Sequence, residues 1–121
     1  MKHILLADED PDILLGLRDY LDSRGYIVTT VTTGQDAAFI AVQNKVSLVL
    51  ICSQLAMDGF DKIREIQKGN HKIPIIIMTS SMEDMHDKKL LPWVHGWLRQ
   101  PIEQDELNMI LTEHIAQEQG K

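Results

Sequence analysis

Three consecutive acidic residues, Asp8, Glu9 and Asp10, directly follow a short apolar run near the N-terminus. Carboxylate oxygens suit a hard divalent cation such as Mg²⁺, which prefers oxygen ligands. The same three acids also suit the start of a helix, because negative charge is favoured at a helix N-terminus. The sequence alone therefore leaves a cation site and a charged helix start as alternatives.

Other familiar signatures of catalysis or metal binding do not occur. No glycine-rich phosphate loop follows the first apolar run, which weighs against a nucleotide or flavin enzyme. The five histidines lack the spacing of a zinc site, and we expect them on the surface. They are His3, His71, His86, His95 and His114.

The composition is typical of one globular domain. The chain has 121 residues, of which 44% are hydrophobic and 25% charged, and we assign residues 1–121 to a single domain. A net charge of -6 argues against nucleic acid or anionic membrane as the main partner. The longest apolar run is far shorter than the ~20 residues that span a bilayer, and the N-terminus lacks a signal peptide. We therefore expect a cytoplasmic protein.

Four short runs consist almost entirely of apolar residues, as is typical of parallel strands buried on both faces. A weaker fifth run, Trp97-Leu98, precedes Pro101. The runs recur about every 22 to 26 residues, which is the length of a strand and a crossover helix. The four stronger runs are residues 4–7, 27–31, 48–52 and 73–78.

The segments between these runs carry helical patterns. The first helix is expected to begin after Asp10 as N-cap, with Pro11 in its first turn, and to end at Gly25. In the second, Ala37, Ala38, Ala41 and Val42 are expected to point inward. The other predicted helices are residues 34–44 (this second helix), 59–68, 81–91 and 103–116. The alternation predicts an α/β fold with a doubly wound, five-stranded parallel sheet.

In such a sheet, ligands bind beyond the carboxyl ends of the strands. The residues that end the predicted strands are therefore the candidate site. These are the acidic triplet at 8–10, then Cys52-Ser53, Thr79-Ser80 and Arg99-Gln100-Pro101.

Four stretches, in this order and spacing, resemble the receiver domain of bacterial response regulators, the CheY-like family. They are residues 4–11, 48–60 with Met57-Asp58-Gly59, 74–80 and 97–102. The resemblance covers the whole chain and implies a flavodoxin-like, three-layer sandwich. It also implies a signalling module of a two-component phosphorelay system and not an enzyme. In that family an acidic pair holds Mg²⁺, and an Asp that ends the third strand accepts a phosphoryl group from a histidine kinase.

The resemblance assigns roles residue by residue. Asp8 and Glu9 match the acidic pair, and Thr79 matches the family's hydroxyl. The phosphoacceptor position falls on Cys52, and a shift of register to Ile51 also provides no carboxylate. The family's lysine before a proline falls on Gln100, and we expect the Gln100-Pro101 bond to be cis, as is typical of that position.

The two replacements are physically coupled. An Asp without the Lys would leave an unpaired carboxylate in an acidic pocket, and a Lys without the Asp would leave an unpaired ammonium. We therefore predict an atypical, degenerate receiver that takes up no phosphate and has no cofactor beyond weak Mg²⁺ at Asp8 and Glu9. One alternative is a working relay receiver that uses Mg²⁺ and an unconventional acceptor.

A second alternative is a thiol sensor at Cys52. Reactive thiols lie in electropositive surroundings, whereas Asp8 and Glu9 are expected to keep this thiol protonated. As the only cysteine, Cys52 cannot form an internal disulfide and fits a reducing compartment. We therefore expect a buried, inert side chain.

Two tryptophans suggest an interaction surface. Trp97 matches the family's switching aromatic, and Trp93 lies close to it in the sequence. In receivers this region dimerises or contacts output partners, and aromatic residues are enriched in interface centres. Core packing is the alternative, above all for Trp97. The implied partner is a protein: a histidine kinase, an output domain, another regulator, or a second copy of the chain.

Overall fold

The computed structural model describes residues 2–43, 46–69, 73–81 and 91–115. Five parallel strands form one sheet in the order β2-β1-β3-β4-β5. They are β1 (His3–Ala7), β2 (Ile27–Val31), β3 (Leu48–Cys52), β4 (Ile75–Thr79) and β5 (Gly96–Arg99). The predicted five-stranded, doubly wound sheet is confirmed.

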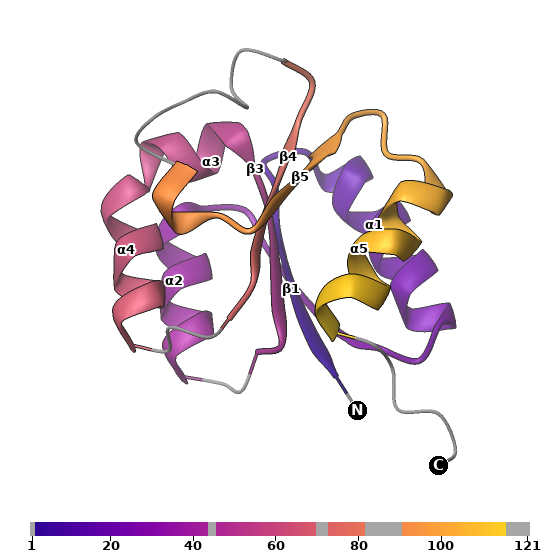
Figure 1. Cartoon of the computed structure of the whole chain (residues 1–121), viewed down its shortest axis with the longest axis horizontal. Coiled ribbons are helices and arrows are strands. Elements are labelled where there is room, and N and C mark those ends of the chain that lie inside the picture. Colours follow the sequence, from indigo (N-terminus) through magenta and orange to yellow (C-terminus); the bar gives the residue numbers. More distant parts are fainter. Residues whose placement is uncertain (1, 44–45, 70–72, 82–90, 116–121) are drawn as a thin grey trace.

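Helices cover both faces of the sheet and complete the three layers (Figure 1). One face carries α1 (Pro11–Ser23) and α5 (Gln104–Ile115). The other carries α2 (Gly34–Gln43), α3 (Ser53–Asp58) and α4 (Phe60–Gly69). This arrangement follows from right-handed crossovers, which place successive helices on opposite faces when the order of strands reverses.

The central strands form the core because both of their faces lie under helices. Every residue of β3 and β4 is buried. Leu50 lies opposite Leu6 on one side and Ile76 on the other, and none of the three is accessible to solvent. Edge strand β2, by contrast, contains no fully buried residue. Three of the four predicted apolar runs therefore form the strands in the middle of the sheet. Burial on both faces was wrong for residues 27–31, which form the edge strand β2.

The start and end of α1 agree with the residue types. The Asp10 side chain accepts a hydrogen bond from the Asp12 backbone N–H at 2.9 Å, and Pro11 occupies the first turn. After the helix, Gly25 adopts a φ of 93°, a conformation that side chains with a Cβ rarely adopt.

Several predicted boundaries and orientations were wrong. The expected loop after β3 contains the short helix α3, so the chain has an additional helix before α4. Val42 is 49% exposed and not inward, because the buried face of α2 consists of three alanines. Strand β4 begins at Ile75, two residues later than predicted. The predicted helix at 81–91 falls almost entirely outside the described residues, and Leu91–Trp93 forms a 3₁₀ turn, η2.

Within the described segments, no helix is both long and apolar enough to cross a membrane.

Two helical glycines provide a matched pair for a stability test. A Cβ on Gly34 would lie 3.1 Å from the Leu55 backbone oxygen, where α2 packs on α3, whereas a Cβ on Gly16 would meet nothing within 4 Å. We expect Gly34→Ala to lower the free energy of unfolding by about 1–2 kcal/mol through overpacking. Gly16→Ala should raise it by about 0.5–1 kcal/mol, because alanine favours helix. Urea denaturation measures both, and equal stabilisation by the two would contradict the packing described.

Candidate functional site

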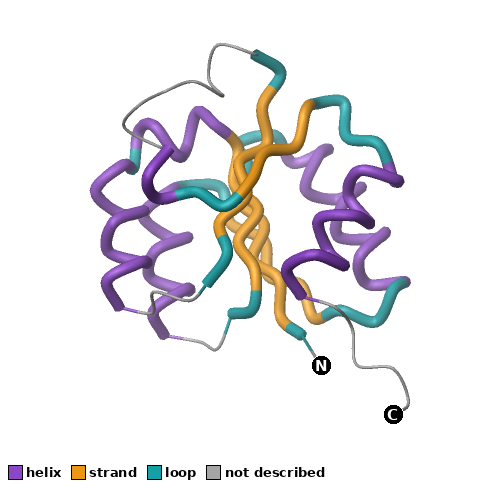
Figure 2. The backbone as a smooth tube through the Cα atoms, viewed as in Figure 1, coloured by secondary structure: helices purple, strands orange, loops and turns teal. Residues whose placement is uncertain are grey.

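The carboxyl ends of β1, β3, β4 and β5 lie at one edge of the sheet (Figure 2). Ala7 pairs with Ile51, so the next residues, Asp8 after β1 and Cys52 at the end of β3, lie at the ends of adjacent strands. On the other side, the Gln100 backbone N–H donates to the Thr79 carbonyl oxygen at 2.7 Å. The parallel register therefore gathers the predicted site residues at this edge, as expected from the strand pattern.

Asp8 is an unusual acid because its side chain is buried, with only 5% of the residue exposed. One carboxylate oxygen, Oδ1, accepts a hydrogen bond from the Asp10 backbone N–H at 2.9 Å. The other, Oδ2, has no hydrogen-bond partner among the described residues. Such an oxygen is costly to bury, which favours a cation or a donor beside it. Glu9, in contrast, is exposed.

Cys52 ends β3 and immediately precedes α3, where its side chain makes no capping hydrogen bond. The residue is 8% exposed, and its thiol is free. Burial raises the pKa of the thiol, and the negative charges of Asp8 and Glu9 raise it further, against the opposing effect of two backbone N–H groups. The thiol is therefore protonated near neutral pH, as expected from its acidic neighbours.

The Thr79 hydroxyl is used within the chain. Its Oγ1 accepts a hydrogen bond from the Ser81 backbone N–H at 3.0 Å and donates to the Ser81 carbonyl oxygen at 3.2 Å. This local pairing closes the turn that follows β4. Thr79 therefore lies at the predicted site edge with its hydroxyl engaged by the turn.

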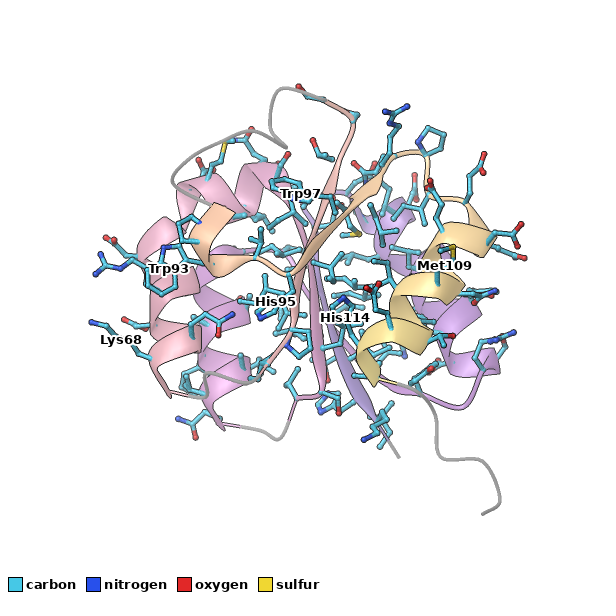
Figure 3. All side chains as sticks on the ribbon, viewed as in Figure 1. Lys68, Trp93, His95, Trp97, Met109 and His114 are labelled. Carbon is cyan, nitrogen blue, oxygen red and sulfur yellow. The ribbon has the colours of Figure 1, made fainter. Side chains whose placement is uncertain are left out.

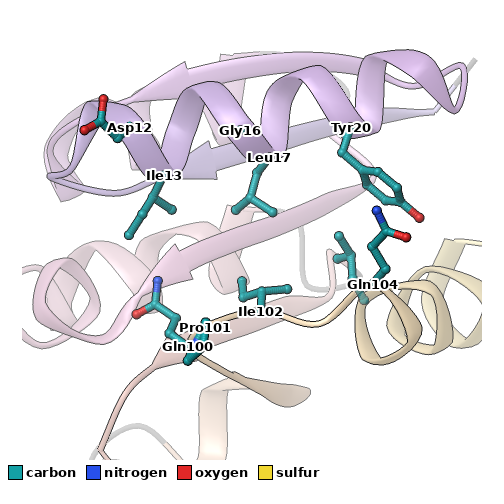
Figure 4. Close-up of a pocket in the computed structure, with 10 residues that line it drawn as sticks. Asp12, Ile13, Gly16, Leu17, Tyr20, Gln100, Pro101, Ile102 and Gln104 are labelled. Atoms are coloured by element: carbon teal, nitrogen blue, oxygen red, sulfur yellow. The ribbon is translucent and has the colours of Figure 1, made fainter.

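The Gln100-Pro101 bond is cis, as predicted. Gln100 lines a groove of about 410 Å³ between α1 and the segment from β5 to α5 (Figure 4). The sequence analysis did not predict this groove. Gly16 in the middle of α1 was a usable signal, because glycine has no side chain to fill the space beside the helix. Its lining comprises Asp12, Ile13, Gly16, Leu17, Tyr20, Gln100, Pro101, Ile102, Gln104 and Leu107.

The donor set at the strand ends fits Mg²⁺ poorly. Asp8 Oδ2 is an available oxygen, and Glu9 could provide a second carboxylate from the exposed side. The third strand end provides the protonated thiol of Cys52, which is a poor ligand for Mg²⁺. In the part of the chain that the structure describes, no three His, Cys, Asp or Glu side chains lie close enough together to hold a metal ion.

The two tryptophans are half-buried and pack against the core (Figure 3). The Arg64 guanidinium lies 5.9 Å from the centre of the Trp93 ring. Met109, on α5, is 70% exposed and lies on the other side of the molecule from Trp93 in Figure 3. Each tryptophan therefore both packs inward and presents part of its ring to solvent, so neither core packing nor a contact surface accounts for them alone.

A buried glutamine in α4, Gln67, was missed by sequence reasoning. Its amide nitrogen donates to the carbonyl oxygens of Ile73 at 3.3 Å and Trp93 at 3.2 Å. It thereby ties α4 to the segment that enters β4 and to η2. A polar residue on the inward face of an amphipathic helix was the available signal, because a buried amide needs partners.

The chain is similar in sequence and in fold to known signalling proteins. Residues 4–112 match the family described as "Response regulator receiver domain". "Transcriptional regulatory protein GlrR" of Escherichia coli (strain K12) is 34% identical over 120 residues, which are 95% of this chain and 26% of that protein. "Response regulator SaeR" of Staphylococcus aureus (strain USA300) is 30% identical over 87 residues, which are 72% of this chain and 38% of that protein.

Among solved structures, the receiver domain of the sensor histidine kinase PA1611 from Pseudomonas aeruginosa PAO1 has a TM-score of 0.85 and 28% identity. The match covers 96% of this chain and 98% of that domain, which has a magnesium ion in its active site cleft. The chain spans well under half the length of the two curated relatives.

Proposed function

The chain belongs to the response regulator receiver domain family, and we propose that it is an atypical member that signals by protein contact without phosphorylation of an aspartate. One observation carries this proposal: Cys52, with a buried and protonated thiol, ends β3 where the family has its phosphoacceptor Asp. A neutral thiol provides no carboxylate for an acyl phosphate. The domain, residues 1–121, then acts as a cytoplasmic signalling module and not as an enzyme.

Gln100 supports the same proposal. It stands where the family has a Lys, so the strand ends lack the cation that pairs with a phosphoryl group there. Its side chain lines the groove beside α1. The loss of both the acid and its cation leaves the formal charge of the pocket unchanged. Unchanged charge is expected if the two residues were replaced together, because either replacement alone would leave an unpaired charge.

The same features weigh against a thiol sensor and against a relay that uses an unconventional acceptor. Reactive thiols have a lowered pKa and are accessible, whereas burial and two nearby acids raise the pKa of Cys52. Thr79, which matches the family's hydroxyl, is buried and paired with Ser81.

Weak Mg²⁺ binding is the expected remnant of the family's metal site. Asp8 Oδ2 and the Glu9 carboxylate would hold the ion, which would supply positive charge at the strand ends. We expect a dissociation constant of about 10 mM or weaker, because the third carboxylate is missing. The measurement is a Mg²⁺ titration followed by amide chemical shifts, with Asp8→Asn as the control. Binding in the micromolar range would contradict this prediction.

The contact surface that we propose lies along η2 and β5, around Trp93 and Trp97 (Figure 3). The predicted helix at 81–91, which belongs to the same predicted surface, lies almost entirely outside the described residues. Aromatic side chains are enriched at protein interfaces. The expected partner is a histidine kinase, an output domain or another regulator, and a homodimer remains an alternative. Net negative charge argues against nucleic acid contact by this domain.

A binding assay against the purified histidine kinases of the source organism, with and without ATP, tests the proposal. We expect one kinase to bind with the same affinity in both conditions, and Trp93→Ala to weaken the complex about tenfold or more. Gln35→Ala, on the exposed part of α2, is the control. A complex whose affinity changes only after phosphate moves from the kinase to this chain would contradict the proposal.

A further inference from the structure

A histidine side chain makes the first link between β4 and edge strand β5. The His95 backbone N–H donates to the Ile75 carbonyl oxygen at 2.8 Å. In return, the Ile75 backbone N–H donates to Nδ1 of the His95 ring at 3.1 Å. This reciprocal pair precedes the first registered residues of the ladder, Ile76 opposite Gly96. An imidazole nitrogen thus takes the place of a backbone carbonyl at the start of an edge strand.

We propose that His95 is a proton-operated latch on β5, which is closed when the imidazole is neutral and opens when Nδ1 takes up a proton. In the closed state, the Nδ1 lone pair accepts the Ile75 N–H, so the ring proton resides on Nε2. When a proton from solvent binds Nδ1, the ring becomes a cation with donors on both nitrogens. The Ile75 N–H and the new Nδ1–H of His95 then face each other, and the hydrogen bond between Ile75 and His95 is lost.

The buried position of Ile75 makes this loss consequential. Ile75 has no solvent-exposed surface, so its N–H has no ready access to water while the strands stay together. A buried donor without a partner is unfavourable, and the ladder can restore a partner only if its first link separates. Because β5 has only four residues and pairs on one side only, this link is a large part of its attachment.

The charged surroundings of His95 lie mainly on α5. The His114 ring packs edge-to-face with the His95 ring, with 6.4 Å between the ring centres, and Glu113 lies 4.0 Å from His114 Nε2. On the other side, Gln67 is neutral, and Lys68 points away from His95 (Figure 3). Within the described ranges, which omit residues 1, 44–45, 70–72, 82–90 and 116–121, His114 is the group whose charge acts on His95.

The surroundings favour the neutral ring. Partial burial lowers the pKa of His95 below its usual 6.5, and the positive charge of His114 lowers it further. The unfolded chain therefore binds a proton at His95 more readily than the folded chain does. Above pH 6.5 the ring is neutral in both states, and its contribution to the stability of the fold is fully present. As the pH falls through 6.5 towards the lower pKa of the folded protein, that contribution is lost. The latch therefore opens on acidification.

This inference extends beyond contact signalling and does not depend on it. Opening of the latch acts on the strand that carries Trp97, which lies opposite Ile77 on β4. It would make the attachment of β5 sensitive to proton concentration whether or not a partner binds. The test therefore uses the free protein, so its outcome is separate from that of the kinase assay.

An NMR pH titration from about pH 8 to about pH 5 tests the latch, with the Ile75 amide and the His95 ring nitrogens as probes. We expect the Ile75 amide and the His95 ring to titrate with one shared midpoint below 6.5. Amide exchange at Ile75, corrected for the intrinsic effect of pH, should become about tenfold faster across that midpoint. An Ile75 amide that does not follow the His95 ring would overturn the proposal.

Two variants separate the latch from other titrations. His95→Gln keeps an amide oxygen as acceptor but cannot titrate, so the Ile75 amide should become insensitive to pH in this range. His114→Gln removes the neighbouring positive charge and should move the shared midpoint upward. An unchanged Ile75 titration in His95→Gln would overturn the proposal. If His95→Gln does not fold, a shared titration midpoint that stays unchanged in His114→Gln would overturn the proposal.

Discussion

The double substitution Cys52→Asp with Gln100→Lys is expected to produce a protein that gains one phosphoryl mass from a small-molecule phosphodonor and Mg²⁺. The unaltered chain should gain none under the same conditions. The fold already aligns the ends of β1, β3, β4 and β5, so only the acceptor and its cation have to be supplied. Intact-protein mass spectrometry measures the change, which we expect in more than half of the molecules.

Each single-substitution variant should take up less phosphate than the double variant and should be less stable. Cys52→Asp alone places a third carboxylate beside Asp8, whose Oδ2 is already buried without a partner among the described residues. Repulsion between like charges should then lower the free energy of unfolding by about 1–3 kcal/mol. Gln100→Lys in the same molecule supplies the opposite charge and should recover most of this loss.

The matched control is Cys52→Ser with Gln100→Lys. It introduces the same cation and a small polar side chain but no carboxylate, so it should gain no phosphoryl mass that hydroxylamine removes. Phosphorylation of this control at the same level as the Asp-containing double variant would show that the acceptor is elsewhere in the chain, and the assignment of Cys52 would be wrong.

Gln67→Glu is expected to destabilise the fold by about 3 kcal/mol at neutral pH. The amide nitrogen of Gln67 donates to two carbonyl oxygens, those of Ile73 and Trp93, from a buried position. A carboxylate of the same shape cannot donate and would face both oxygens with negative charge. Urea denaturation at pH 7 measures the loss.

The pH dependence of this variant distinguishes a charge effect from altered packing. Burial beside two acceptors would raise the pKa of the new carboxyl group in the folded protein, so the variant should recover stability relative to the unaltered chain as the pH falls. Gln35→Glu, on the exposed first turn of α2, is the control and should change stability by less than about 0.5 kcal/mol. Equal losses in the two variants would contradict the buried role of Gln67.

The apolar runs predicted the sheet because strands buried on both faces leave little freedom in residue type. Residues 48–52 were predicted with the bounds that the structure has. Helix α3 was not predicted, because six residues are too few for a helical period to appear. The orientation of Val42 was wrong because the buried residues of α2 are three alanines, and Val42 lies on the exposed side of the helix.

At the candidate site, residue type and strand position predicted which residues meet, since parallel strands end at one edge. The burial of Asp8 and its unpartnered Oδ2 could not be read from the sequence, because Asp8 and Glu9 are similar acids in adjacent positions. The role of Gln67 and the pairing of His95 with Ile75 also depend on contacts between segments distant in the chain. No local pattern encodes such contacts.

The mass of the unaltered protein after incubation with Mg²⁺ and a small-molecule phosphodonor tests the central claim most directly. The proposal that Cys52 and Gln100 end phosphoryl transfer at this site predicts an unchanged mass, with the fold intact by circular dichroism. A gain of one phosphoryl mass that is removed by hydroxylamine would reveal a carboxylate acceptor, and signalling by contact alone would then be contradicted.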